Sequence, residues 1–175
     1  TGFMTLYPRQ LALEWGDFAL AAMILAMLVG GSACSTAGGF KGLRVGLIWK
    51  AVVQETRRML KPPSAVFAQS YGYHGRRLLS EAQARSASLL VLMYVAIFFL
   101  ATAAGAACGY PFLDAAFESA SVTGNVGFSI GITQAGMPDF LKIVYIFNMW
   151  AGRLEFMAVL ATFAFVAAFF RRKRA

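Results

Sequence analysis

The sequence predicts an all-α membrane protein in which helices alternate with short re-entrant loops and one helix is broken inside the membrane. Three observations predict this fold class. Of the 175 residues, 59% are hydrophobic and only 14% are charged, whereas a soluble domain carries about 25% charged residues. Long runs without charge are separated by glycine-rich segments, and basic residues gather at two places along the chain. Lipid is needed to cover this apolar surplus, which excludes an ordinary soluble enzyme and a disordered chain.

The first predicted element is a broken helix over residues 11–60. Its apolar run from Phe18 to Val29 has 12 residues, about 18 Å of helix, which is too short for a hydrocarbon core of about 30 Å. The run ends in a glycine-rich loop over residues 30–39. A span that stops partway needs protein or a water-filled cavity to receive its backbone amides, and such an interruption points to a transport site. An extramembrane linker after a short helix is the alternative.

The next elements are two long membrane helices with a short helix between them. Residues 86–113 form a stretch of 28 residues without charge, which predicts an outer helix over 78–106. A second span, the inner helix, is predicted over 138–171. Between them, residues 111–122 predict a helix of about three turns, because Pro111 suits a first helical turn. The segment 123–131 that follows is too rich in glycine to continue this helix.

The charge distribution predicts the orientation in the membrane. Nine of the 16 Lys and Arg residues lie between Lys41 and Arg85, and four are in the basic tail at the C-terminus. Because Lys and Arg accumulate on the cytoplasmic side, the 41–85 connector and the C-terminus are expected inside, and the 106–138 region outside. The 111–131 segment must then enter from outside and return there. The net charge of +8 is thus explained by topology, and no nucleic-acid partner is expected.

The re-entrant segment has the chemistry of an ion-selective loop. A pore that selects a dehydrated monovalent cation surrounds it with backbone carbonyls. Glycine lets successive carbonyls turn toward one axis, and a short helix behind the loop aims its negative C-terminal end at the ion. The segments 111–122 and 123–131 meet these needs. An ordinary glycine-rich surface turn is the alternative.

Three motifs resemble one known family. The run from Gly30 to Arg44 resembles the G-G-x-x-x-S-T-x-G-G-x-K-x-x-R signature of the TrkH/KtrB potassium-uptake proteins. Asn125-Val126-Gly127-Phe128-Ser129 resembles the filter of their fourth repeat, and residues 148–155, with G-R-L-E, resemble their last helix. In that family, four helix–pore-loop–helix repeats surround one ion path, as in potassium channels. The resemblance implies the end of the third repeat over 1–61, a cytoplasmic connector over 62–77 and the fourth repeat over 78–175.

The resemblance also assigns roles to single residues. The third filter would leave a remnant at Thr1, Gly2 and Phe3, where a Gly-Phe pair echoes Gly127-Phe128. Arg153 and Lys41 would act with the intramembrane loop that gates permeation. The filters would comprise Thr1, Gly2, Phe3, Gly124, Asn125, Val126, Gly127 and Phe128, with Thr1, Gly2, Asn125, Val126 and Gly127 as carbonyl ligands of potassium. The gate would comprise Gly30, Gly31, Ser32, Ala33, Cys34, Ser35, Thr36, Ala37, Gly38, Gly39, Lys41 and Arg153.

Arg153 allows two interpretations. A charge near the bilayer centre is costly and normally faces a cavity or a partner, so Arg153 would act as a barrier or tether below the filter. It could instead hold packing, although Glu155 lies two positions away and does not face it on a helix. Lys41 and Arg44 could be plain cytoplasmic charges.

Catalysis is not expected. Ser32, Ser35 and Thr36 lack a neighbouring base, and Asp114 and Glu118 would make a poor acid–base pair. Cys34 and Cys108 are interpreted as small buried apolar residues.

The resemblance implies potassium uptake across the bacterial cytoplasmic (inner) membrane, with potassium as the substrate and no covalently bound cofactor. It further implies a homodimer in membrane lipid and a TrkA/KtrA-like cytosolic ring of nucleotide-binding regulatory subunits. The chain, which opens at Thr1, is expected to be part of a longer protein. Two alternatives remain open: a sodium-permeable channel of the same architecture, and a structural membrane subunit that does not transport. Channel-like and proton- or sodium-coupled transport are equally compatible with the sequence.

Overall fold

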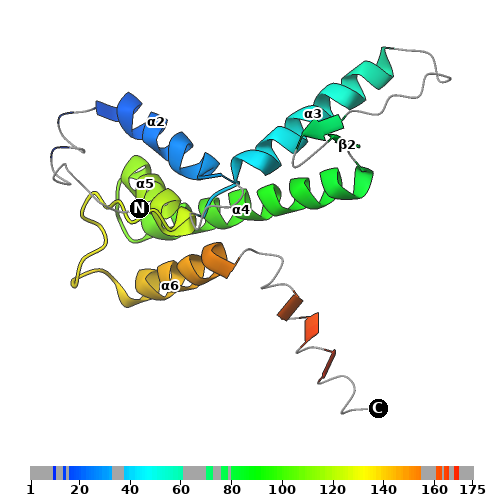
Figure 1. Ribbon diagram of the computed structural model, residues 1–175. Coiled ribbons are helices and arrows are strands. Elements are labelled where there is room, and N and C mark those ends of the chain that lie inside the picture. The colour runs from blue at the N-terminus through cyan, green and yellow to red at the C-terminus, as the bar shows by residue number, and fades with distance from the viewer. Residues whose placement is uncertain are drawn as a thin grey trace.

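The computed structural model describes residues 10, 14, 16–32, 38–60, 70–72, 76–78, 80–154, 161–162, 164–165 and 168–169. The elements are arranged around one short central helix, and their ribbon is shown in Figure 1. In chain order they are α2 (Gly16–Val29), α3 (Gly42–Met59), β1 (Ser70–Gly72), β2 (Arg76–Leu78), α4 (Glu81–Ala107), α5 (Phe112–Gly124) and α6 (Asp139–Leu154).

The short helix α5 is the centre of the fold. It contacts α2, α4 and α6, which lie around it in Figure 1. Every residue from Ala115 to Gly124 is buried. Gly105 of α4 allows part of this close approach, because a Cβ there would lie 2.9 Å from the Cβ of Ala115. The shortest of the helices α2 to α6 is thus also the most enclosed.

Two apolar clusters hold α5 in place. The first joins α5 to α2 and α4, and the second joins α5 to α4, α6 and the loop before α6. Burial of such side chains is the main favourable term that fixes the helix positions. The first cluster contains Leu20, Ile24, Met27, Phe98, Ala116, Phe117 and Ala120, and the second contains Ala101, Val122, Ile132, Met137, Leu141 and Tyr145.

Helix α4 begins three residues later than the predicted start at residue 78. Ser80 is its N-cap: its hydroxyl accepts from the backbone N–H of Gln83 at 3.2 Å, and the Gln83 side chain accepts from the Ser80 N–H at 3.3 Å. This reciprocal capping box satisfies amides that would otherwise be unpaired at the helix start. Within the described residues, Ala82–Ala107 is the helix that is long and apolar enough to cross a membrane.

The other elements also differ slightly from the predicted ranges. The helix predicted over 111–122 continues to Gly124, and the predicted broken helix is divided into α2 and α3. Of the helix predicted over 138–171, α6 covers Asp139–Leu154. Strands β1 and β2 form a small antiparallel pair, with Tyr71 opposite Arg77. Strands of three residues are too short to show alternation in the sequence.

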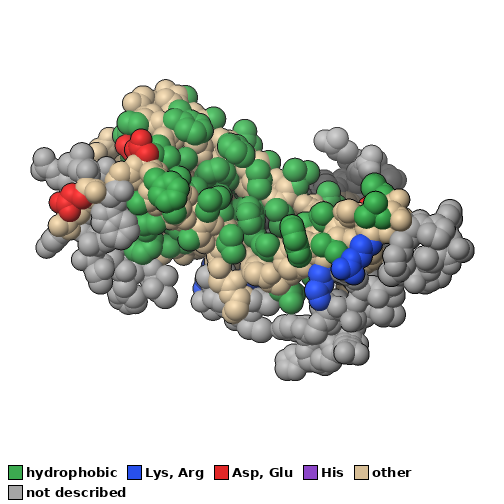
Figure 2. All heavy atoms as spheres, turned by 90° about the horizontal axis from the view of Figure 1, so that it is seen from above, with side chains coloured by type: hydrophobic (Ala, Val, Ile, Leu, Met, Phe, Trp, Pro, Cys, Tyr) green, Lys and Arg blue, Asp and Glu red, His purple; other side chains and the backbone are tan. Residues whose placement is uncertain are grey.

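Many large apolar side chains are exposed on this chain. Phe18 is 89% exposed, Leu100 69% and Ile143 68%. Figure 2 shows hydrophobic side chains spread over the middle of the visible face. An apolar surface of this extent suits contact with lipid or with further protein rather than with water.

Candidate functional site

The candidate site begins where α5 ends. Asn125 has left-handed backbone angles, φ 51° and ψ 39°. The Val126 N–H donates to the Ser121 carbonyl at 2.9 Å, and the Asn125 N–H donates to the Val122 carbonyl at 3.2 Å. These two bonds form a Schellman motif, which terminates a helix sharply. The carbonyls of Thr123 and Gly124 are not used by this motif and are left to other partners.

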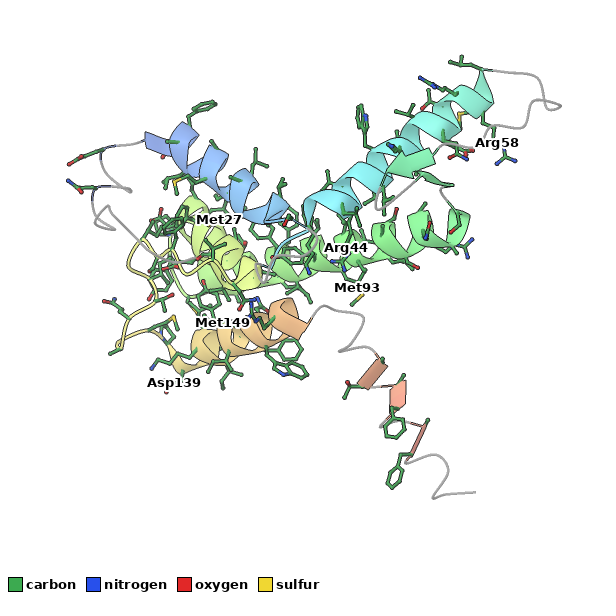
Figure 3. The ribbon with its side chains drawn as sticks, viewed as in Figure 1. Met27, Arg44, Arg58, Met93, Asp139 and Met149 are labelled. Carbon is green, nitrogen blue, oxygen red and sulfur yellow. The ribbon has the colours of Figure 1, made fainter. Side chains whose placement is uncertain are left out.

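The side chain of Asn125 ties the end of α5 to α6. Its amide nitrogen donates to the carbonyl of Met149 at 3.2 Å, and Met149 is labelled on α6 in Figure 3. Asn is one of the few residues that adopt the left-handed conformation readily. One residue therefore ends the helix and anchors its end.

The loop after Asn125 contains the exposed Gly127. Residues 126–129 have no regular secondary structure, and Gly127 has a φ of 92°. Residues with a Cβ rarely adopt such a φ, so glycine is the residue that suits this position. Gly127, Phe128 and Ser129 line a pocket together with Glu118. The predicted filter residues Gly124, Asn125, Val126, Gly127 and Phe128 thus lie in one connected turn, whereas Thr1, Gly2 and Phe3 lie outside the described residues.

Glu118 supports the far end of this loop, a role that could not be assigned from the sequence alone. The side chain is 1% exposed. Its Oε1 accepts from the Ile132 and Thr133 N–H groups, both at 3.1 Å, and from the Ser129 hydroxyl. The sequence does show a carboxylate inside an apolar helix, followed by a loop whose amides need acceptors, but it does not show which amides bond to that carboxylate.

At the break between α2 and α3 the chain returns close to itself. We call the residues that meet there, 28–31 and 38–42, the neck. The Phe40 N–H donates to the Leu28 carbonyl at 2.9 Å, and the Gly42 N–H donates to the Gly31 carbonyl at 3.1 Å. A Cβ on Gly39, whose φ is 91°, would lie 2.8 Å from the Cα of Gly30. The chain thus leaves α2 and enters α3 at nearly the same place. Of the predicted gate, residues 33–37 lie outside the described residues.

The neck contacts the end of α5 directly. The Gly38 N–H donates to the Gly124 carbonyl at 3.0 Å. A Cβ on Gly38 would lie 2.7 Å from the Gly124 carbonyl carbon. Phe40 packs edge-on against Tyr94 of α4, with ring centroids 5.1 Å apart. The predicted gate and the predicted filter, which are far apart in the sequence, are therefore in contact.

The end of α6 approaches the same point. A Cβ on Gly152 would overlap the Thr123 carbonyl oxygen and lie 2.9 Å from the amide nitrogen of Asn125. Gly152 also lines a small cavity with Gly38, Gly39, Lys41, Arg44 and Tyr94. Arg153 is the next residue, exposed in the last described turn of α6. Lys41 of the predicted gate is thus placed at this cavity, between Phe40 and Gly42 of the neck.

This site does not resemble a metal centre built from side chains. In the part of the chain that the structure describes, there is no group of three or more His, Cys, Asp or Glu residues that could hold a metal ion. The polar atoms that the described residues bring together at the site are mostly backbone N–H groups and carbonyls, many of them bonded to one another.

Comparison with known proteins gives consistent matches. Residues 12–171 match the TrkH family, described as cation transport protein. An uncharacterized cation transporter of Methanocaldococcus jannaschii is 34% identical over 94% of this chain and 33% of that protein. The Trk system potassium uptake protein TrkH of Salmonella typhimurium is 28% identical over 86% of this chain and 31% of that protein.

The fold also matches a solved structure. The potassium transporter TrkH from Vibrio parahaemolyticus superposes with a TM-score of 0.69 and 25% identity, over 85% of this chain and 31% of that one. This chain spans about a third of the length of these relatives. The resemblance and the helical fold class predicted from the sequence are confirmed. Since the family match covers nearly the whole chain, this chain belongs to the TrkH family of cation transport proteins.

Proposed function

We propose that this chain forms part of a potassium-uptake path, in which the loop from Gly124 to Phe128 is one segment of a carbonyl-lined selectivity filter. One observation carries the proposal. A buried short helix ends at an exposed loop whose glycine has a positive φ, and the neck of a broken helix is bonded to that helix end. A filter needs this combination, because carbonyls must be free to face an ion while the backbone behind them is held.

The proposed gate is the segment between the two halves of the broken helix, from Gly30 to Gly39, with Lys41 and Arg153 beside it. Small residues let such a loop occupy a pore without filling it permanently. Its neck is fixed by backbone bonds to Leu28 and Gly31, which hold the ends of α2 and α3 together at the base of the segment. Arg153 follows Gly152, which contacts the end of α5, and would place a positive charge near the gate.

The proposal extends to the whole protein by analogy with its relatives. The remaining filter segments, including Thr1, Gly2 and Phe3, would complete a ring around potassium, which is substrate and not cofactor. The transporter would lie in the bacterial cytoplasmic membrane with its C-terminus in the cytoplasm, as a homodimer surrounded by lipid. A cytosolic ring of nucleotide-binding regulatory subunits would meet the basic 41–85 connector and the basic tail. Neither enzymatic activity nor nucleic-acid binding is part of this proposal.

The test is replacement of Gly127 by Ser in the complete transporter. Holding a residue with a Cβ at a φ of 92° costs about 1–3 kcal/mol of backbone strain. The loop carbonyls should therefore shift, and the preference for potassium over sodium should fall by about tenfold. The measurement is uptake of potassium, rubidium and sodium in a host deficient in potassium uptake, with expression checked.

Gly136→Ser is the matched control. Gly136 is exposed, with no atom within 4 Å of the position that a Cβ would take and no positive φ, and its replacement should leave ion preference unchanged. Equal preference in Gly127→Ser and the unmodified protein would refute the filter assignment. Equal uptake of sodium and potassium by the unmodified protein would favour the sodium-permeable alternative, and no uptake at all would favour a structural subunit.

A further inference from the structure

The strongest feature outside the predicted filter and gate is the buried carboxylate of Glu118. It lies in the middle of α5 and is 1% exposed. A carboxylate in a protein interior is unfavourable unless hydrogen bonds or opposite charges compensate for its lost hydration. Glu118 receives three hydrogen bonds on Oε1 alone, from the Ser129 hydroxyl and from the N–H groups of Ile132 and Thr133.

These donors are all in the segment that follows the filter loop. Ser129 also bonds within this segment, since its hydroxyl oxygen accepts from the Gly131 N–H at 3.0 Å. Ile132 is 5% exposed and belongs to the cluster between α4, α5 and α6. Hydrogen bonds to a carboxylate are stronger than those between neutral groups, so this carboxylate fixes the 129–133 segment against α5.

The loop is therefore held at both ends. At its start, Asn125 is fixed by the Schellman motif and by its bond to the Met149 carbonyl. At its far end, Glu118 holds residues 129–133. Gly127 lies between the two fixed points, in a stretch of only a few residues. Movement of either end would reorient the carbonyls of this short stretch.

We propose that Glu118 is a positioning residue for ion selection: it holds the outer end of the filter loop and thereby keeps the Val126–Phe128 carbonyls aimed at the ion. This inference rests on the proposed function, because it assigns Glu118 a part in that same filter. It goes beyond the sequence-based interpretation, in which Glu118 was considered only as a poor acid–base partner of Asp114.

The test compares Glu118→Ala with Glu118→Gln in the complete transporter. Ala removes the acceptor, so the preference for potassium over sodium should fall by about fivefold or more, because three donors lose their partner. Gln keeps an acceptor oxygen at the same position and should retain the preference within about twofold. Asp114→Asn is the matched control, because Asp114 is a carboxylate in the first turn of the same helix; it should leave the preference unchanged.

A second measurement tests the hydrogen bonds of Glu118 independently of transport. Amide hydrogen exchange at Ile132 and Thr133 in the purified protein should be faster in Glu118→Ala than in the unmodified protein and in Glu118→Gln. Ser129→Ala, which removes one of the three donors, should show a smaller change in both measurements. It serves as the informative variant if Glu118→Ala does not fold.

Several results would overturn the inference. These are unchanged exchange, unchanged preference despite faster exchange, a loss in Glu118→Gln as large as in Glu118→Ala, or a Ser129→Ala variant identical to the unmodified protein. Absence of potassium uptake by the unmodified protein is a different result, which refutes the proposed function; the exchange measurement would then still show whether Glu118 holds the segment.

Discussion

Individual glycines determine how closely separate segments approach the end of α5. Gly38 from the neck of the broken helix and Gly152 from α6 both lie against its last carbonyls. At each position a Cβ would come closer to backbone atoms than real Cβ atoms do. The absence of a side chain is thus a packing requirement here, distinct from the conformational requirement at Gly127.

Replacing Gly152 by Ala should destabilise the protein, because the added Cβ meets the Thr123 carbonyl, which is backbone and cannot rotate away. Overpacking of this kind costs about 1–3 kcal/mol, which corresponds to a fall in Tm of about 2–12 °C for a chain of this size. Thermal unfolding of the detergent-solubilised protein measures this.

Gly46→Ala is the control for the change at Gly152. Gly46 lies in the interior of α3, with nothing within 4 Å of an added Cβ, so Ala should raise stability by about 0.5–1 kcal/mol. A Tm for Gly152→Ala that equals or exceeds that of the unmodified protein would show that α5 and α6 do not pack as described.

Replacing Arg153 by Gln tests the proposed division between gate and filter. The change removes a charge but leaves the loop carbonyls in place, so uptake rate or gating should change while ion preference stays nearly intact. A charge below a filter affects every monovalent cation alike. Uptake of potassium, rubidium and sodium is the measurement. If Arg153→Gln alters ion preference as much as Gly127→Ser, Arg153 must help to shape the filter itself.

At the scale of elements, the break between α2 and α3 is the feature that links the proposed gate to the proposed filter. Helix α2 has only 14 residues, so α2 and α3 meet at the level of the α5 terminus rather than on opposite sides of it. The hydrogen bond from Gly38 to Gly124 joins the base of the loop to this terminus. The fixed base of the proposed gate is therefore bonded to the helix that carries the proposed filter loop.

Deleting residues 32–37 should raise passive cation flux. The neck bonds between Phe40 and Leu28 and between Gly42 and Gly31 already hold the two helix ends together, so a shorter connection can be made without separating α2 from α3. Flux into liposomes that contain the purified complete transporter measures the effect, with thermal stability as the control. Unchanged or reduced flux in a stably folded variant would argue that the loop is structural.

At the scale of the whole molecule, the chain exposes apolar surface on several helices and spans about a third of its relatives. A carbonyl ring for an ion needs more loop segments than the one described here. We expect residues 1–175 by themselves to give no potassium uptake, and the complete transporter to restore growth of an uptake-deficient host at low external potassium. Robust uptake by the isolated chain in liposomes would contradict the four-repeat arrangement.

Most of the helices could be predicted because their signals are local. A charge-free run of about 20 or more residues predicts a membrane span, and α4 is found close to its predicted range. Glycine-rich runs marked the ends of α2 and α5 within two residues. The capping box at Ser80 shifted the start of α4, because the exact boundary depends on side-chain hydrogen bonds that an apolar run does not specify.

The sequence by itself determined that this is a helical membrane protein of the TrkH family, with a broken helix and a glycine-rich loop after a short helix. Only the tertiary structure decided that the neck at Gly38 bonds to Gly124, that Gly152 packs on Thr123, and that Glu118 holds the segment after the loop. The physical reason is the separation along the chain over which each effect acts. Hydrophobic runs and glycine content act over neighbouring residues, whereas these contacts join segments that come together only when the helices pack.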